Sequence, residues 1–345
     1  MRRRDFIKAI VGTAAPWPLR ARAQQPALII GLLTSRAADD SPQLLTAIRQ
    51  GLKETGFVEG QNVTIEYRFA GNQNDRLPAL AADLVNRQVN LILATTTTAA
   101  VAAKAATKSI PIVFEMGSDP VRLGLIANLN RPEANITGIT QLNVVVAPKR
   151  LEVLHDLVPN STIMTLLVDS TEPVTAEATT SDLQAAARNL GLELHVLSAS
   201  TDADLDAVFT KVIELRAGGL VVGGGAFFTA RGARLGALAL RYAVPTVYEG
   251  RAFVTAGGLM SYGANLADSY RLAGTYAGRV LKGEKPSDLP VQQSTKLEMF
   301  LNLKTAKVLG ITVPLPLSGR ADDSLRLSVV RQCGRSRCGR SNEGR

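Results

Sequence analysis

Hydrophobic residues follow two alternating patterns along the first part of the chain, short unbroken runs and longer segments with helical spacing. Three runs are almost entirely aliphatic, as the buried strands of a parallel sheet are: Ala27–Leu33, Val89–Ala94 and Ile110–Glu115. Asn62–Phe69 alternates in polarity, as a half-buried strand does. Three intervening segments carry apolar residues three or four positions apart and are predicted to be helices: Pro42–Thr55, Asp75–Arg87 and Thr98–Thr107. This order predicts a parallel sheet with helices on both faces.

The same order starts again at residue 162. Further strands are predicted at Thr162–Val168, Leu192–Leu197, Gly219–Val222 and Val244–Tyr248. Further helices are predicted at Thr175–Asn189, at Asp202–Arg216 with Thr201 as its cap, and at Phe228–Tyr242. Two such units predict an α/β protein with two doubly wound, Rossmann-like lobes, joined at Asn143–Pro159. Three late segments are expected to recross between the lobes: Asp268–Lys282, Lys296–Asn302 and Leu303–Leu309.

The formal net charge of the 345-residue chain is +9, and its location changes what it implies. The excess of Arg and Lys lies in residues 1–23 and 319–345, so that residues 24–318 are formally neutral. A nucleic-acid-binding protein needs a basic face on its folded body to neutralise phosphates. The charge distribution therefore argues against a nucleic-acid partner.

The first 23 residues have the features of an export signal. Arg3 and Arg4 precede Asp5-Phe6-Ile7-Lys8, which matches the twin-arginine pattern, and a short apolar stretch follows. Ala21-Arg22-Ala23 then offers a small-x-small cleavage site. We expect residues 1–23 to address the twin-arginine export machinery and to be removed near Ala23, leaving a periplasmic protein.

The last residues, 317–345, differ in composition from the rest of the chain. Arg, Gly and Ser crowd this segment, which also holds both cysteines, Cys333 and Cys338. Such a sequence buries too little apolar surface to offset the entropy lost on ordering, and we expect a disordered Arg-rich tail. Two cysteines with no neighbouring His or further Cys do not predict a zinc site.

Several stretches resemble the ABC transporter substrate-binding proteins of the tryptophan/tyrosine-importer type. The matching segments are Gly51-Leu52-Lys53-Glu54-Thr55-Gly56-Phe57-Val58-Glu59-Gly60-Gln61-Asn62, Ile65-Glu66-Tyr67-Arg68, Asp75-Arg76-Leu77-Pro78, Ile110-Pro111-Ile112-Val113-Phe114, Gly117-Ser118-Asp119-Pro120-Val121, Asn135-Ile136-Thr137-Gly138, Gly257-Gly258-Leu259-Met260-Ser261-Tyr262-Gly263 and Asn302-Leu303-Lys304-Thr305-Ala306. The resemblance spans residues 1–316, and the tail after Arg320 departs from it.

This resemblance implies a type I periplasmic binding protein, in which three crossings of the chain form the hinge between the lobes. We expect one lobe to comprise residues 24–143 with about 264–288, and the other 144–263 with about 289–316. It also implies a solute-binding component of an ABC importer, without cofactor or catalysis, that delivers its ligand to a membrane permease as a monomer or weak dimer.

Ligands of open α/β sheets bind at the carboxyl ends of the strands, so the residues that follow each predicted strand are the candidate ligand-binding residues. In the first unit they are Thr34, Ser35, Thr95, Thr96, Thr97, Gly117, Ser118 and Asp119. In the second unit they are Asp169, Ser170, Thr171, Ala226, Phe227, Tyr248 and Glu249, with Tyr262 at an expected crossing. Hydroxyls and amides suit a carboxylate, acidic groups suit an ammonium, and aromatic rings suit an apolar group. Together they predict a site for an amino acid or an aromatic or small carboxylate.

Some of these residues have a structural interpretation as well. Thr95–Thr97 suits both a pocket and a helix cap, and Asp119 before Pro120 suits a turn. Phe227 and Phe228 are adjacent, so that one can face the core and the other the cleft. Gly223-Gly224-Gly225 lacks the remaining residues of a phosphate-binding loop, which favours a tight turn. His155 and His195 have no partner at metal-ligand spacing.

Two other functions are compatible with parts of this pattern. An exported enzyme would need a nucleophile with a base or a carboxylate pair, and the sequence shows no such arrangement. A periplasmic subunit that senses a ligand for a receptor would have the same fold as a transport subunit, so sequence patterns leave that alternative open.

Overall fold

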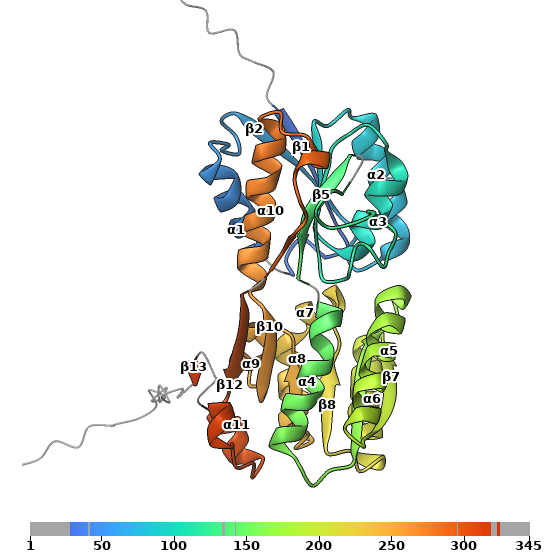
Figure 1. The fold of residues 1–345 in the computed structure, drawn as a ribbon, viewed down its shortest axis with the longest axis vertical. Coiled ribbons are helices and arrows are strands. Elements are labelled where there is room, and N and C mark those ends of the chain that lie inside the picture. Colours follow the sequence, from blue (N-terminus) through green and yellow to red (C-terminus); the bar gives the residue numbers. More distant parts are fainter. Residues whose placement is uncertain are drawn as a thin grey trace, which may run out of the picture.

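The computed structural model describes residues 28–40, 42–132, 135–141, 143–294, 296–318 and 323–324. The expected export signal and most of the expected tail lie outside these residues. The described chain forms two α/β lobes stacked along the long axis of the molecule (Figure 1).

The first lobe is built on a parallel sheet whose strands have the order β11-β5-β4-β3-β1-β2. Its strands are β1 (Leu28–Thr34), β2 (Val63–Phe69), β3 (Leu91–Ala94), β4 (Ile112–Met116), β5 (Ile136–Thr140) and β11 (Gln292–Gln293). The alternating residues of β3 face opposite sides. Leu91 and Leu93 pack with α1 (Pro42–Glu54) and α10 (Leu266–Leu281), whereas Ile92 packs with α2 (Leu77–Asn86) and α3 (Thr97–Ala106). Short 3-10 turns lie at Asn74–Arg76 and Pro286–Asp288.

The second lobe repeats this architecture with the strand order β13-β12-β10-β9-β8-β6-β7. Its strands are β6 (Ile163–Asp169), β7 (Glu193–Ala199), β8 (Gly219–Val222), β9 (Thr246–Tyr248), β10 (Met260–Ala264), β12 (Leu297–Leu301) and β13 (Asp323–Ser324). All neighbours are parallel except β10 and β12. One face carries α4 (Asn143–Leu157), α5 (Pro173–Asn189), α11 (Leu303–Val308) and α12 (Leu315–Ser318). The other carries α6 (Asp202–Glu214), α7 (Ala226–Ala230), α8 (Gly232–Arg241) and α9 (Arg251–Thr255). The prediction of two doubly wound lobes is therefore confirmed.

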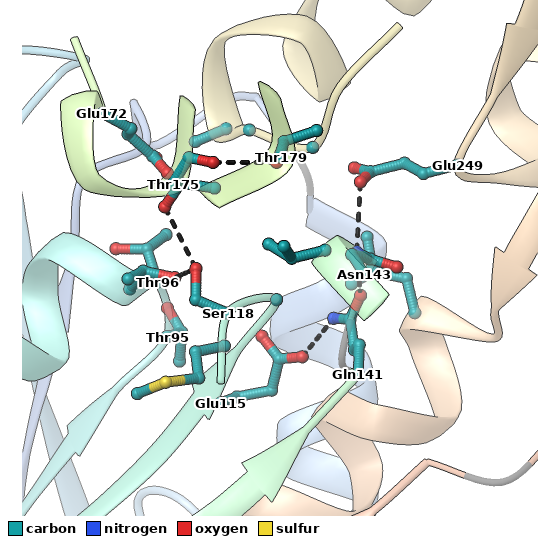
Figure 2. A pocket seen from close by; sticks show the side chains of 18 of the residues that line it. Thr95, Thr96, Glu115, Ser118, Gln141, Asn143, Glu172, Thr175, Thr179 and Glu249 are labelled. Atoms are coloured by element: carbon teal, nitrogen blue, oxygen red, sulfur yellow. Dashed lines mark hydrogen bonds between the residues drawn. The ribbon is translucent and has the colours of Figure 1, made fainter. Parts of the chain in front are cut away.

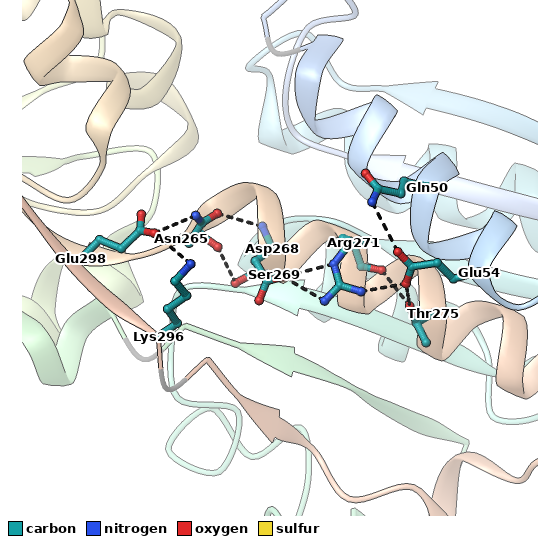
Figure 3. A network of polar contacts seen from close by, with 9 residues as sticks. All are labelled: Gln50, Glu54, Asn265, Asp268, Ser269, Arg271, Thr275, Lys296 and Glu298. Atoms are coloured by element: carbon teal, nitrogen blue, oxygen red, sulfur yellow. Dashed lines mark hydrogen bonds and ion pairs between the residues drawn. The ribbon is translucent and has the colours of Figure 1, made fainter. Parts of the chain in front are cut away.

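The chain passes between the two sheets three times. The crossings follow β5, β10 and β11, so the lobes are not consecutive in sequence. At the second and third crossings, Asn265 Nδ2 donates to Glu298 Oε1 at 3.0 Å, and the Asn265 side chain also accepts from the amide of Asp268 at the start of α10 (Figure 3). Arg271 on α10 then contacts Glu54 on α1 at 2.7 Å, which ties the crossings to the first lobe.

Some boundaries differ from those expected. β11 pairs with β5, and Leu289 and Val291 are buried in the first lobe, so the third crossing comes after residue 293 rather than near 288. The expected joining segment Asn143–Pro159 is mostly helix α4, whose buried Leu151 and Leu154 belong to the core of the second lobe. The predicted helix Phe228–Tyr242 is two helices separated at Arg231.

Candidate functional site

The candidate site is a polar cleft between the lobes, at the carboxyl ends of the strands. Five strands have the same order in both lobes, β2-β1-β3-β4-β5 and β7-β6-β8-β9-β10, so the winding direction changes beside β1 and β6. Loops diverge at such a switch point and leave a crevice. The residues that line the cleft are Arg36, Thr95, Thr96, Thr97, Glu115, Met116, Gly117, Ser118, Gln141, Asn143, Val144, Glu172, Thr175, Thr179, Gly224, Gly225, Ala226, Glu249 and Leu266.

Hydroxyl groups form the wall that the first lobe contributes (Figure 2). Thr96 is the N-cap of α3, and its Oγ1 accepts from the amide of Ala99 at 3.3 Å. Thr97 Oγ1 donates to Ser118 Oγ at 3.1 Å. Thr96 therefore has both of the roles considered for it, helix cap and cleft wall, and the positive end of the α3 dipole faces the cleft.

Arg36 adds a cation to the same wall. The side chain follows β1 and is only 9% exposed. Its Nε lies 3.4 Å from the hydroxyl oxygen of Tyr270, and Tyr270 in turn donates to the carbonyl of Thr95 at 2.8 Å. The Nη1 atom is buried and has no hydrogen-bond partner within the described part of the chain. A buried guanidinium nitrogen without an acceptor is costly, so this donor is suited to an anionic group of a ligand.

Three carboxyl groups reach the cleft from different elements (Figure 2). Glu115 on β4 is 2% exposed, and burial raises its pKa to about 8 despite the hydrogen bond from Gln141 and the charge of Arg36. Glu172 precedes α5 and is 7% exposed; burial, aided by the negative charge of Asp169, raises its pKa to about 7. Burial also raises the pKa of Glu249, although the charges of Arg150 and Arg36 oppose this. In all three groups, burial therefore favours the protonated form of the carboxyl group.

A chain of amide side chains connects two of these carboxyl groups across the first crossing. Gln141 donates to Glu115, and Asn143 Nδ2 lies 2.8 Å from Gln141 Oε1 and 3.1 Å from Glu249 Oε2. Arg150, which is fully buried, holds Asn143 through Oδ1 at 3.2 Å and the carbonyl of Tyr262 at 2.7 Å. The first crossing is thus fixed by side chains of both lobes.

Direct contacts between the lobes close the cleft. Ser118 Oγ lies 3.0 Å from Thr175 Oγ1 on α5, and Asn74 Nδ2 donates to the carbonyl of Thr171 at 3.1 Å. Nearer the surface, Arg122 pairs with Asp182 on α5 at 3.0 Å. None of these contacts involves a segment of chain that crosses between the lobes. They form only when the lobes lie against each other, so the structure is a closed arrangement of the lobes.

Many of the predicted site residues lie in the cleft and others do not. Thr95, Thr96, Thr97, Gly117, Ser118, Ala226 and Glu249 line it. Thr34 and Ser35 lie at the buried end of β1, where Thr34 lines a smaller pocket beside Arg36. Asp119 accepts from the amides of Val121 and Arg122, as its turn interpretation requires. Asp169 lies behind Glu172 and accepts from Thr171, while Ser170 is exposed.

The three aromatic residues predicted for the pocket lie elsewhere. Tyr248 is fully buried and stacks on Phe253, with 4.8 Å between ring centroids. Phe227 packs in the same core beneath the guanidinium of Arg231, and Phe228 is buried too, so neither Phe faces the cleft. Tyr262 packs against the core of the second lobe, and its carbonyl accepts a hydrogen bond from Arg150 Nε. For Tyr248, both faces of β9 are buried, so the hydrophobic pattern did not indicate whether the ring points to the core or to the cleft.

Several cleft residues were missed, and some had a detectable signal. Glu115 is the one charged residue of the otherwise apolar strand β4, and a carboxyl group in such a run is unusual enough to suggest a functional role. Arg36 lies one position beyond the candidate Ser35. Gln141 and Asn143 follow β5, a strand that the hydrophobic pattern did not predict. Thr175 and Thr179 project from a helix of the opposite lobe, and their placement depends on lobe closure.

The glycines of the second lobe allow its backbone to approach the carboxyl groups. A Cβ atom on Gly224 would lie 2.8 Å from Glu249 Oε2, and Gly225 has a φ of +159°. This agrees with the tight-turn interpretation of Gly223-Gly224-Gly225.

Within the described residues, no group of three or more His, Cys, Asp or Glu side chains is arranged to hold a metal ion. Nor does any helix among them combine the length and apolar character needed to cross a membrane.

This geometry agrees with the results of comparison with known proteins. The model of the family described as "ABC transporter substrate binding protein" matches residues 38–325. The chain belongs to this family. The Tyrosine-binding protein of Clostridioides difficile (strain R20291) is 25% identical to this family member over 260 residues, which cover 75% of the chain and 74% of that relative.

Solved structures share the fold of this substrate-binding protein. The ABC domain in complex with L-Trp from Streptococcus pneumoniae is 24% identical, with a TM-score of 0.77 and coverage of 86% of this chain and 99% of that one. A ligand-free, open substrate-binding protein with adhesive properties from Clostridium difficile is also 24% identical, with a TM-score of 0.62 and coverage of 84% and 97%. The fold is thus that of the type I periplasmic binding proteins, a class of binding proteins and not of enzymes.

Proposed function

We propose that this substrate-binding protein captures an amino acid or a small carboxylate in the cleft between its lobes and delivers it to the permease of an ABC importer. One observation carries the proposal. Arg36 and the hydroxyls of Thr95–Thr97 line one wall, where Glu115 has a pKa raised to about 8 and is largely uncharged at neutral pH. The carboxyl groups of Glu172 and Glu249 line the wall opposite. Groups of opposite sign on the two lobes match a ligand with a carboxylate and an ammonium, which a closing cleft would bind at both ends.

The names of the relatives support an amino-acid ligand. One is a tyrosine-binding protein and another is a complex with L-Trp. The cleft of this chain has a different apolar lining from the one that the sequence predicts, with Met116, Val144, Ala226 and Leu266 in place of aromatic rings. The polar ends of an amino acid are therefore better supported than any particular side chain.

We also propose that residues 1–23 export the protein through the twin-arginine machinery, since Arg3 and Arg4 stand in the pattern that this machinery requires. Replacing both by Lys keeps the charge and removes the motif. The variant should stay in the cytoplasm, whereas the unchanged chain should appear in the periplasmic fraction. Equal export of both would contradict this route.

A thermal-shift screen of the purified chain tests capture. The panel contains the twenty amino acids, benzoate, other small carboxylates, sugars and nucleosides. A ligand at about 100 times its Kd adds about 2.7 kcal/mol to the free energy of unfolding, which raises the Tm by several degrees. Binding only of sugars or nucleosides would refute the proposed ligand class. Uptake of the identified ligand by cells with and without this chain then tests delivery.

A further inference from the structure

Acidic groups outnumber basic groups in the cleft. Three carboxyl groups line it, those of Glu115, Glu172 and Glu249, and Arg36 is the one basic side chain among the described lining residues. Arg150 contributes a second positive charge from behind Asn143, but its hydrogen bonds go to Asn143 and to the carbonyl of Tyr262. Burial keeps Glu115 largely protonated at neutral pH in the ligand-free protein, and a cationic group bound beside it would favour its ionised form. A zwitterion with one carboxylate and one ammonium would leave at least one of the three carboxyl groups without a cationic partner.

The three carboxyl groups also lie on different sides of the cleft. Glu115 comes from β4 in the first lobe, whereas Glu172 and Glu249 come from separate loops of the second (Figure 2). They do not converge as ligands of a metal ion do, since the described residues contain no metal-binding group. Carboxyl groups on separate sides of one cleft suit an organic ligand with two separated cationic groups.

Arg36 adds a second, independent observation. The guanidinium is more than nine-tenths buried, lines the same cleft and keeps Nη1 without a partner among the described residues. A ligand that carried only positive charge would leave this donor unsatisfied and would add repulsion to it. The ligand that meets both requirements has one anionic group for Arg36 and two cationic groups for the carboxylates.

We propose that the ligand is a basic amino acid, whose side chain ends in an ammonium or guanidinium group. This inference rests on the proposed function and specifies its ligand. The α-carboxylate contacts Arg36 and the hydroxyls of Thr95–Thr97, and the α-ammonium and the side-chain cation pair with carboxyl groups of the cleft. The aliphatic part of the side chain lies against Met116, Val144 and Leu266, which offer an apolar lining without rings.

Calorimetric titration with matched small molecules tests this assignment on the unaltered protein. L-lysine and L-arginine are compared with norleucine, which lacks the side-chain cation, with cadaverine, which lacks the carboxylate, and with L-tryptophan and L-tyrosine. A lost charged hydrogen bond costs at least about tenfold in affinity, so L-lysine or L-arginine should bind at least tenfold more tightly than norleucine and cadaverine.

Two variants locate the contacts. Glu172→Gln and Glu249→Gln preserve the size of each side chain, and each should weaken binding of the basic amino acid at least tenfold. The variant at the partner of the α-ammonium should weaken norleucine binding too, whereas the variant at the partner of the side-chain cation should change norleucine binding much less. Glu214→Gln is the matched control, since Glu214 is exposed on α6 and pairs with Lys211. Circular dichroism verifies that each variant is folded.

The outcomes separate this inference from the function on which it rests. Binding of norleucine, L-tyrosine or L-tryptophan as tight as that of L-lysine and L-arginine would overturn the basic ligand and leave amino-acid capture intact. Cadaverine binding as tightly as L-lysine would overturn the role of Arg36. If a folded protein bound no amino acid and no carboxylate, both proposals would fail.

Discussion

At the scale of single residues, the environment of Glu115 has the clearest consequence for stability. The group is buried on β4, with Gln141 as its hydrogen-bond partner and Arg36 close enough to affect its ionisation. Desolvation dominates and raises its pKa from an ordinary value of 4.5 to about 8. The folded protein therefore keeps a proton on Glu115 at pH values where the unfolded chain has released it.

We expect the ligand-free protein to lose stability as the pH rises. A carboxyl group with a raised pKa in the folded state stabilises that state fully below pH 4.5, and the contribution is lost as the pH approaches 8. Each pKa unit corresponds to about 1.4 kcal/mol, so the loss is of the order of a few kcal/mol. Glu115→Gln, which cannot ionise, should be less sensitive to pH, and Glu214→Gln should behave as the unchanged protein does. Thermal unfolding between pH 5 and pH 8 measures this, and identical pH profiles for all three proteins would contradict it.

At the scale of helices and strands, the two glycine-containing faces of α1 and α10 determine how closely these helices pack. A Cβ atom on Gly51 would lie 1.8 Å from the carbonyl oxygen of Arg271, and one on Gly274 would lie 2.2 Å from that of Ile48. Neither obstacle is a flexible side chain that could move aside. Because α10 begins directly after the second crossing, this contact also positions the hinge in the first lobe.

Gly274→Ala should therefore destabilise the protein, although Ala is the better helix former. Replacing Gly by Ala in a helix gains roughly 1 kcal/mol from helix propensity, whereas overpacking a close contact costs about 1–3 kcal/mol. The overpacking cost is the larger of the two if the backbones of α1 and α10 cannot separate. We expect a Tm lower by a few degrees. Gly250→Ala is the control, because Gly250 has a φ of −138° and no atom within 4 Å of the added Cβ. An unchanged or higher Tm for Gly274→Ala would show that the helices can move apart.

The helices and strands also show which parts of the fold and of the site could be predicted from the sequence. The hydrophobic period and the caps located most strands and helices. Thr201, for instance, is the predicted cap of α6, and in the structure it forms a capping box with Asp204. The rule on strand ends found Thr95–Thr97, Ser118 and Glu249, because strand direction alone fixes which edge they share. It could not place Tyr248, since both faces of β9 are buried, or Thr175, which reaches the cleft from a helix only when the lobes close. Site residues set by lobe orientation require the three-dimensional structure.

At the scale of the whole molecule, closure of the two lobes links the surface to ligand affinity. The ion pair between Arg122 and Asp182 spans the lobes, and both side chains keep access to solvent, at 48% and 28% exposure. It contributes to the closed arrangement without lining the interlobe cleft. A ligand that binds the closed form has an apparent Kd equal to its intrinsic Kd divided by the closed fraction, so a weaker closed state lowers affinity at a distance.

Arg122→Ala should therefore raise the Kd of the ligand identified in the screen. An exposed ion pair contributes about 0.2–1 kcal/mol, which limits the increase to roughly fivefold. Salt screens such pairs, so titration in 500 mM salt should bring the variant and the unchanged protein closer together than titration in 50 mM salt does. Lys211→Ala removes a comparable exposed pair that lies within one helix of the second lobe, and should leave the Kd unchanged. A loss far above fivefold that persists in high salt would mean that Arg122 acts on the ligand directly and not through closure.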